Sequence, residues 1–181
     1  METMKFMCIF LLLPLMMLLS ACQSQPTPVP EIVPAVEVKK NVKRHALGVI
    51  GQVEPVYVLP MKSPIQARID TGAETSSIDA DNIKPFERDG EKWVAFDIIN
   101  RTNGEKYHFE KPIRKVTEIV RINEHEKRYV VEMNIKMGHL LLSNVKFTLA
   151  VRDKFNYQVL IGRNVLTGRA LVDTALSNTL N

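Results

Sequence analysis

The sequence predicts one all-β domain, and three observations support this fold class. From about residue 43 onward, apolar residues recur in short runs of period two that glycine and proline interrupt. Only the segment 163–167 has a helical pattern, and it is one or two turns long. The chain has 181 residues, 45% of them hydrophobic, which suffices for one core but not for two ordinary domains. A β-barrel or β-sandwich is therefore expected.

The expected strands follow from these runs in chain order. Residues 103–104 are an Asn-Gly pair, a turn signal that joins two of the runs as a hairpin. Alternate residues from Tyr129 to Met137 fall on one face, and the run from Val145 to Val151 alternates in the same way. The sequence shows no internal repeat. The strands are expected at 46–53, 56–59, 65–69, 93–99, 105–110, 116–122, 129–137, 145–151, 159–161 and 170–172.

Charge and cysteine content exclude several classes of function. The formal net charge is +4, from 24 basic and 20 acidic side chains, and it is spread along the chain. No stripe of Lys and Arg with interleaved aromatic residues is present, so nucleic-acid binding is not expected. Two cysteines are too few for a disulfide framework or a Cys-rich zinc site.

The N-terminal residues have the features of a targeting segment. Lys5 precedes the apolar run 6–19, which is shorter than the roughly 20 residues that a membrane-spanning helix needs. The run ends in Leu19-Ser20-Ala21-Cys22, which resembles the lipobox of bacterial lipoproteins. The resemblance implies a signal peptide over 1–21 and a lipidated Cys22. A plain signal peptide with a cysteine near its cleavage site is the alternative.

Residues 22–42 are expected to form a tether between the lipid anchor and a domain over 43–181. The segment contains Pro26, Pro28, Pro30 and Pro34 and few large apolar residues, which favours an extended, polyproline-like conformation. Several acyl chains on Cys22 would hold the protein firmly at the bilayer. Residue 23 is Gln rather than Asp. In Gram-negative lipoproteins, which the lipobox resembles, this residue implies the outer membrane rather than retention at the inner membrane, with the domain facing the periplasm.

Two short motifs carry the chemistry. An apolar run over 65–69 leads into Asp70-Thr71-Gly72-Ala73-Glu74. A second run leads into Leu160-Ile161-Gly162-Arg163-Asn164. In this order the motifs resemble those of retropepsin-like aspartic peptidases, over roughly residues 46 to 173. The resemblance implies a retropepsin-like closed β-barrel with one short helix after the Gly-Arg motif.

The carboxylate of Asp70 is the candidate catalytic group. Hydrolysis without a nucleophilic side chain needs one carboxylate to take a proton from water and a second carboxyl group at the scissile carbonyl. Gly72 would let the backbone approach the carboxylate. The resemblance implies that Thr71 bonds across to its counterpart in a partner chain, that Ala73 and Gly162 support the site, and that Glu74 and Arg163 form an ion pair.

One Asp-Thr-Gly motif supplies only one of the two carboxyl groups. The sequence Asp173-Thr174-Ala175 echoes the motif, but the eight residues that follow Asp173 cannot build a second lobe. Asp173 is therefore interpreted as a residue of the terminal strand. The consequence is a C2 homodimer in which each chain contributes Asp70.

Two hairpins are candidates for the element that would cover the substrate. Counting back from Gly138 places its tip at 123–126, and counting forward from Asp70 favours 100–104. One of the two hairpins is expected to be an insertion relative to the retroviral enzymes. The tip at 123–126 has no glycine, unlike the Gly-rich retroviral flap.

The whole pattern is closest to small bacterial proteins often labelled ATP-dependent zinc proteases, some relatives of which accompany ATP-grasp glutamate ligases. The sequence has no His-Glu-x-x-His motif, and His45, His108, His125 and His139 lack ligand-like spacing. It also has no Gly-x-x-x-x-Gly-Lys loop for a nucleotide phosphate. We therefore expect no metal and no cofactor.

The sequence thus predicts a membrane-anchored aspartic endopeptidase that acts on peptide bonds or glutamyl-type amide bonds of a peptide or protein substrate. The alternative is a catalytically inactive envelope lipoprotein of the same fold that binds a peptide or a cell-wall component. Ser76 and Ser77 have no His-Asp pair at a recognisable spacing and are interpreted as strand residues.

Overall fold

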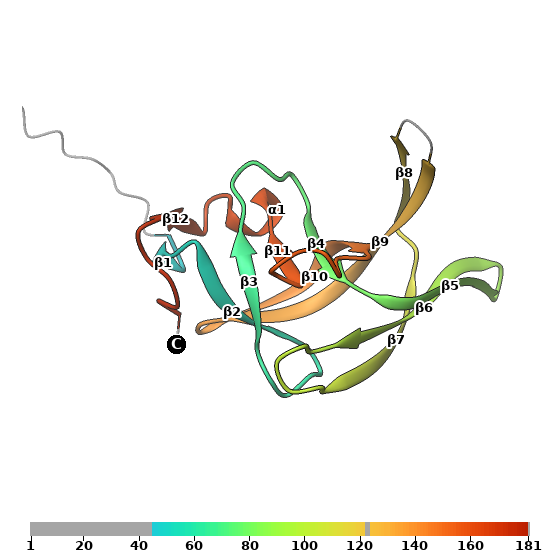
Figure 1. Ribbon diagram of the computed structural model, residues 1–181, viewed down its shortest axis with the longest axis horizontal. Helices are drawn as coiled ribbons and strands as arrows, with labels where there is room; N and C mark the ends of the chain where they lie inside the picture. The colour runs from blue at the N-terminus through green and yellow to red at the C-terminus, as the bar shows by residue number, and fades with distance from the viewer. Residues whose placement is uncertain (1–44, 122–123, 181) are drawn as a thin grey trace, which may run out of the picture. The chain divides into compact units, whose positions relative to one another are not determined.

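The computed structural model describes residues 45–121 and 124–180 (Figure 1). The segments expected as signal peptide and tether, including Cys22, lie outside the described residues, as does Asn123 at the tip expected for one hairpin. Among the described residues, no helix has the length and apolar character needed to cross a membrane. The elements are β1 (Gly48–Ile50), β2 (Val53–Val58), β3 (Ile65–Ile69), β4 (Ser76–Asp79), β5 (Asp81–Arg88), β6 (Glu91–Ile99), β7 (Lys106–Pro112), β8 (Lys115–Arg121), β9 (Glu124–Met137), β10 (Leu140–Ala150), β11 (Val159–Ile161), α1 (Arg163–Leu166) and β12 (Ala170–Val172).

Six strands close into a barrel, which confirms the expected all-β barrel with one short helix after Gly162. Around the barrel the order is β10, β4, β11, β3, β2 and β9, and the antiparallel pairing of β9 with β10 closes the ring. The strand β8 pairs only with β9, so β8 and the first part of β9 form a hairpin that extends from the barrel (Figure 1).

The barrel interior is filled by alternate residues of its strands. In β9, Val131, Met133, Ile135 and Met137 are all buried, as their period of two predicts. Phe147 in the paired strand β10 lies opposite Val131 and is also fully buried. The side chains of β3 alternate between buried and exposed along the whole strand. The core therefore fixes the position of β3, which leads into the Asp-Thr-Gly motif.

A separate three-stranded sheet consists of β5, β6 and β7. The expected hairpin around 100–104 is the β6–β7 connection of this sheet. The strand β5 was not predicted from the sequence, because Pro85 lies in its middle and its side chains are exposed or half-buried without an apolar alternation. Its partner β6 is buried at residues 94 and 96–98, and Phe96 packs there against Phe109 with ring centroids 5.4 Å apart.

One buried carboxylate fastens this sheet from within. Asp97 is 5% exposed and accepts hydrogen bonds from Asn82, His108 and Lys106, with 2.7 Å from Asn82 Nδ2 and 2.9 Å from Lys106 Nζ. These hydrogen bonds, the one from Asn82 first, hold the pKa of Asp97 well below its ordinary value. The buried carboxylate of this sheet therefore has three hydrogen-bonding partners.

The expected strand 46–53 is wrong as one element, because it is divided at Gly51. A Cβ at Gly51 would lie 2.4 Å from the carbonyl oxygen of Leu176, so only glycine allows the C-terminal segment to cross there. The segment from Asp173 to Leu180 runs along residues 50–54, and Gln52 N donates to Leu176 O at 2.8 Å. The short β1 instead pairs in parallel with β12.

The carboxylate of Glu54 holds the end of this C-terminal segment in place. Glu54 is fully buried, and its Oε1 accepts from Gly51 N at 2.6 Å and from the Thr179 hydroxyl at 2.7 Å. The amide N–H groups of Thr179 and Leu180 also donate to the carboxylate, at 3.1 and 3.0 Å. We call this arrangement of Glu54, Gly51, Thr179 and Leu180 the Glu54 clamp.

Candidate active site

Asp70 lies directly after β3, at the edge of the barrel. Asp70 N donates to Ile161 O at 2.9 Å, which continues the parallel pairing of β3 with β11 past the end of the strand. The carboxylate is half-buried, and its Oδ1 accepts from Gly72 N at 2.9 Å and from Ala73 N at 3.1 Å. Two backbone donors therefore fix the orientation of this carboxylate, as expected for Gly72.

Arg163 ties the Asp70 loop to the short helix. Its Nη1 donates to the carbonyl oxygens of Thr71 at 3.2 Å and Gly72 at 2.6 Å, and its backbone N donates to Ala73 O at 2.8 Å. The expected ion pair between Glu74 and Arg163 is wrong within the chain, because the guanidinium bonds to these carbonyls and both side chains are exposed. Glu74 contributes its carbonyl oxygen instead, which accepts from Asn164 N at 3.1 Å.

Gly162 allows the two motifs to touch. A Cβ at this position would lie 2.9 Å from Ala73 O and 2.9 Å from the carbonyl carbon of Thr75, which is closer than real Cβ contacts come. Backbone atoms cannot move aside as a flexible side chain can. The support that the sequence assigns to Ala73 and Gly162 therefore has a physical basis in this contact.

We predict that Gly162→Ala displaces the Asp70 loop and destabilises the protein. The added methyl group meets backbone on two sides, and overpacking of this kind costs about 1 to 3 kcal/mol of unfolding free energy. Urea unfolding of the variant measures the loss. Thr167→Ala, at the exposed end of the same helix, is the control and is expected to unfold like the parent. Equal stability of Gly162→Ala and the parent would contradict the contact.

Sequence reasoning gave no role to Asn164, although the motif contains it. Its Oδ1 accepts from Ser76 N at 2.9 Å and from the Ser76 hydroxyl at 2.8 Å, and its Nδ2 donates to Lys146 O at 2.9 Å. Ser76 is fully buried in β4, and its Oγ accepts from Gly162 N at 3.0 Å. The serine and the asparagine thus join the Asp70 loop, the helix and β10.

A hollow of about 360 Å³ opens beside Asp70 and Thr71, and Val172 and Thr174 of the C-terminal segment line its other side. The neighbouring Asp173 closes a turn through its carboxylate, which accepts from Ala175 N at 2.9 Å. This geometry agrees with a structural interpretation of Asp173, which directly follows β12.

Basic side chains lie around Ser77 and Asp79 of β4. Arg152 donates to the Ser77 hydroxyl at 3.0 Å and to Tyr157 O at 3.2 Å, and Asp79 forms an ion pair with Arg101. Burial lowers the pKa of Arg152, the neighbouring Asp79 opposes this shift, and Arg128 and Arg101 add to it. Asp70 makes a smaller contribution that also opposes the lowering of the Arg152 pKa.

A second hollow, of about 490 Å³, lies between β9 and the segment that follows β10. Arg128 of β9 lines it and binds Glu126 through two hydrogen bonds of 2.8 and 2.9 Å. Val151 and Phe155 line the opposite side and are 59% and 56% exposed. Lys154 and Asp153 complete the lining, so the hollow combines apolar surface with charge of both signs.

The described part of the chain holds no group of three or more His, Cys, Asp or Glu side chains that could bind a metal ion. His108 is bonded to Asp97 in the separate sheet, and His139 lies in the turn between β9 and β10. The groups described at the Asp70 site are its carboxylate, the N–H groups of Gly72 and Ala73, and the Arg163 guanidinium.

Comparison with known proteins shows what this chain is similar to. The family model RimB-like, described as "Retropepsin-like aspartic endopeptidase RimB", matches residues 49–180. The chain is also 40% identical over 116 residues to a "Probable alpha-L-glutamate ligase" of Shewanella pealeana. The matched region covers 62% of this chain and 25% of the relative. A protein of the same name from Parasynechococcus marenigrum is 36% identical over 121 residues, 64% of this chain and 25% of the relative.

The chain therefore spans about a quarter of the length of these curated relatives. Among solved structures, a Legionella pneumophila protein with unknown function (DUF785) is similar, with a TM-score of 0.62 and 31% sequence identity. The match covers 74% of this chain and 98% of the Legionella chain.

Proposed function

Because the chain belongs to the RimB-like family of retropepsin-like aspartic endopeptidases, we propose that it hydrolyses amide bonds of peptides with a water molecule held between two Asp70 carboxyl groups. The observation that carries the proposal is the geometry of Asp70. Its carboxylate is oriented by Gly72 and Ala73, in a loop that Arg163 and Gly162 fix from the other motif.

The reaction follows from the chemistry of two adjacent carboxyl groups. Close together, they share one proton, because both cannot easily ionise. The ionised Asp70 takes a proton from water as the water oxygen attacks the scissile carbonyl carbon. The protonated Asp70 of the other copy donates to the carbonyl oxygen. As the tetrahedral intermediate collapses and the C–N bond breaks, the first Asp70 gives the proton from water to the leaving amine. The second Asp70 takes a proton from a hydroxyl of the intermediate, which restores the shared proton.

A second copy of the chain supplies the second carboxyl group in this proposal. Val49 of β1 and Leu171 of β12 are paired in register and are each 52% exposed, so they form an apolar patch. Val172, the next residue, lines the hollow that contains Asp70 and Thr71. An apolar surface that continues to the edge of the site supports a C2 dimer through this face.

We predict that Leu171→Glu makes the protein monomeric and removes its amidase activity. Two like charges would face each other across a two-fold axis, and the patch would stay solvated. Light scattering measures the mass, and the free energy of unfolding of the monomer is expected to change little. Leu141→Glu is the control, because Leu141 is a 64% exposed leucine of β10 away from the patch. A dimeric Leu171→Glu variant would exclude this interface.

The β8–β9 hairpin is the element proposed to cover the substrate. It borders the hollow lined by Arg128 and Phe155, whereas the β6–β7 hairpin belongs to the separate sheet. In the proposal the three-stranded sheet is the insertion, and the tip near 123–126 is the flap.

The proposed bonds include glutamyl-type amides. Relatives named as glutamate ligases support this choice, and so does Arg152, which donates to Ser77 in β4, whereas Arg101 and Arg128 are paired with Asp79 and Glu126. The test is cleavage of α-linked and γ-linked oligoglutamate beside a peptide library of neutral composition. Cleavage of no substrate class by a folded dimer would favour the inactive, ligand-binding alternative.

We further propose that the protein is an outer-membrane lipoprotein anchored through acylated Cys22. The basis is the lipobox-like sequence alone. We expect wild-type protein to incorporate labelled palmitate and to sediment with membranes, and Cys22→Ser to do neither. Cys8→Ser, which changes the cysteine inside the expected signal peptide, is the control. Membrane association of an unlabelled Cys22→Ser variant would contradict the anchor.

A further inference from the structure

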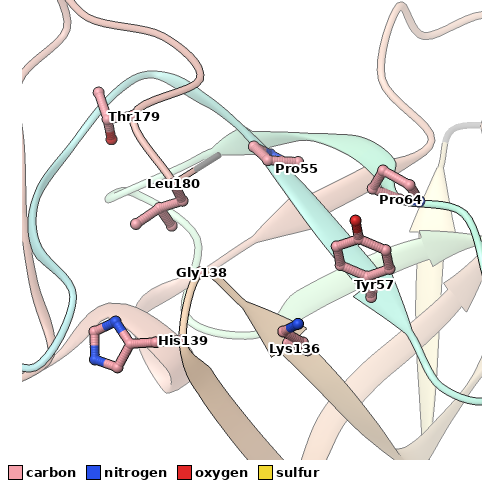
Figure 2. Close-up of a pocket in the computed structure, with 8 residues that line it drawn as sticks. All are labelled: Pro55, Tyr57, Pro64, Lys136, Gly138, His139, Thr179 and Leu180. Atoms are coloured by element: carbon pink, nitrogen blue, oxygen red, sulfur yellow. The ribbon is translucent and has the colours of Figure 1, made fainter.

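A hollow of about 490 Å³ lies at the opposite end of β3 from Asp70 (Figure 2). Pro64 comes directly before β3, and Pro55 pairs with Gln66 at its start, whereas Asp70 follows its last residue. The five residues of β3 span roughly 16 Å, so this hollow is separate from the aspartate site. The side chains that matter for its chemistry are Pro55, Tyr57, Pro64, Lys136, His139 and Leu180.

The walls of the hollow are fixed in position before any ligand binds. The Glu54 clamp holds Thr179 and Leu180, which line one side. Leu180 in turn lies against the β9–β10 turn, where a Cβ on Gly138 would be 3.2 Å from Leu180 Cδ2. Gly138 has a φ of +52°, a conformation that side chains rarely adopt. A pre-formed cavity of this kind is typical of a small-molecule site.

Lys136 is the cationic side chain among the residues that line the hollow, whereas the Glu54 carboxylate lies behind Thr179 and Leu180 and is partnered there by their N–H groups and a hydroxyl. Lys136 Nζ lies 5.5 Å from the centroid of the Tyr57 ring, and Figure 2 shows the two side chains next to each other. Lys136 forms no ion pair with any residue of the described part of the chain. His139 lies at the rim, and none of the lining residues is acidic. Lys136 supplies a cation beside the Tyr57 ring and two prolines. This surface suits a ligand that carries an anionic group next to an apolar group.

We propose that this hollow binds the C-terminal residue of a peptide whose last side chain is apolar or aromatic. The carboxylate would pair with Lys136, and the side chain would pack against Tyr57, Pro55 and Leu180. The volume suits one or two amino-acid residues. The site is independent of Asp70 and of the proposed hydrolysis.

The test is a titration of the full chain, followed by NMR, with N-acetylphenylalanine and with its C-terminal amide. The two probes differ at one group, where the amide replaces a carboxylate oxygen by NH2 and so removes the charge and one acceptor. We expect the carboxylate to bind about tenfold more tightly, the effect of one charge-assisted hydrogen bond. The same preference is expected in Asp70→Asn, which separates this site from the proposed catalytic function.

Variants assign the effect to individual side chains. Lys136→Ala should remove the preference for the carboxylate, and Lys136→Arg should keep it. Tyr57→Ala should weaken both probes. Lys146→Ala, which removes an exposed lysine of β10 elsewhere on the surface, is the matched control and should change neither.

Several results would overturn the proposal. These are equal affinity for the two probes, an unchanged preference in Lys136→Ala, shifts confined to the Asp70 loop, or no binding of either probe at roughly 10 mM. Octanoate carries the same charged group on an aliphatic chain. If it bound more tightly than N-acetylphenylalanine, the ligand would be a free aliphatic acid rather than a peptide end, and the assignment would be wrong.

Discussion

Asp70→Asn is expected to lower the rate of amide hydrolysis by roughly 10³-fold or more, with the fold and the dimer intact. The asparagine amide keeps the size of the side chain and still accepts from Gly72 N and Ala73 N through its oxygen. It cannot take a proton from water. Mass spectrometry of products from oligoglutamates and a peptide library, at roughly pH 4 to 8, measures the loss.

Asp173→Asn is the matched control for this variant. It makes the same chemical change in the other Asp-Thr sequence, where the carboxylate closes a turn at Ala175. The amide oxygen can still accept that hydrogen bond, so activity and stability should be retained. An equal loss in Asp173→Asn, or full activity in Asp70→Asn, would contradict the assignment of the catalytic carboxylate.

Replacement of Glu54 is expected to have the largest effect on stability. Glu54→Leu leaves the Gly51, Thr179 and Leu180 N–H groups and the Thr179 hydroxyl without their buried acceptor. Hydrogen bonds to a charged group contribute about 1.5 to 3 kcal/mol each, so a loss of roughly 3 kcal/mol or more in unfolding free energy is expected. Urea unfolding of the two proteins measures it.

Glu105→Leu provides the comparison at the surface. Its carboxylate also accepts from two backbone N–H groups, those of Lys62 and Ser63, at 2.7 and 2.9 Å. Because water can replace the carboxylate there, the loss should be much smaller than for Glu54→Leu. Equal losses in the two variants would show that burial of the Glu54 clamp does not matter.

The Glu54 clamp also gives stability a pH dependence of known sign. Burial alone would raise the pKa of Glu54, but the hydrogen bonds from the Thr179 hydroxyl and from the amides of Gly51, Leu180 and Thr179 lower it below its ordinary value of 4.5. The folded state therefore binds the proton less readily than the unfolded state. This contribution is complete above the unfolded-state pKa and is lost as the pH falls through the folded-state pKa. Glu54→Gln should remove it from the pH profile of unfolding.

The sequence predicted the fold well where the pattern was local. The bounds of β3, β11 and β12 agree with the expected runs, because an apolar alternation or a motif defines each of them. The strand β5 was missed since its residues are mostly exposed and its hydrogen bonds come from β6. The division at Gly51 depends on Leu176, a contact between distant parts of the chain that no local pattern reveals.

For the site as well, local motifs were predictable from the sequence, whereas contacts between distant residues were not. The structure brings the Asp70 loop and the Gly162-Arg163 turn together, as the two motifs predicted. The expected Glu74–Arg163 pair was wrong, because the guanidinium reaches backbone carbonyls that sequence patterns do not record. The role of Asn164 was missed for a related reason: its partner Ser76 lies 88 positions away in the chain.

The most direct test of the shared site is activity in mixtures of wild-type and Asp70→Asn chains that are allowed to exchange subunits. If each site needs Asp70 from both copies, activity falls with the square of the wild-type fraction, so an equal mixture keeps about a quarter of the activity. If one chain suffices, activity falls in direct proportion and about half remains. The first result is the one expected, and the second would contradict a catalytic site built from two Asp70 carboxyl groups.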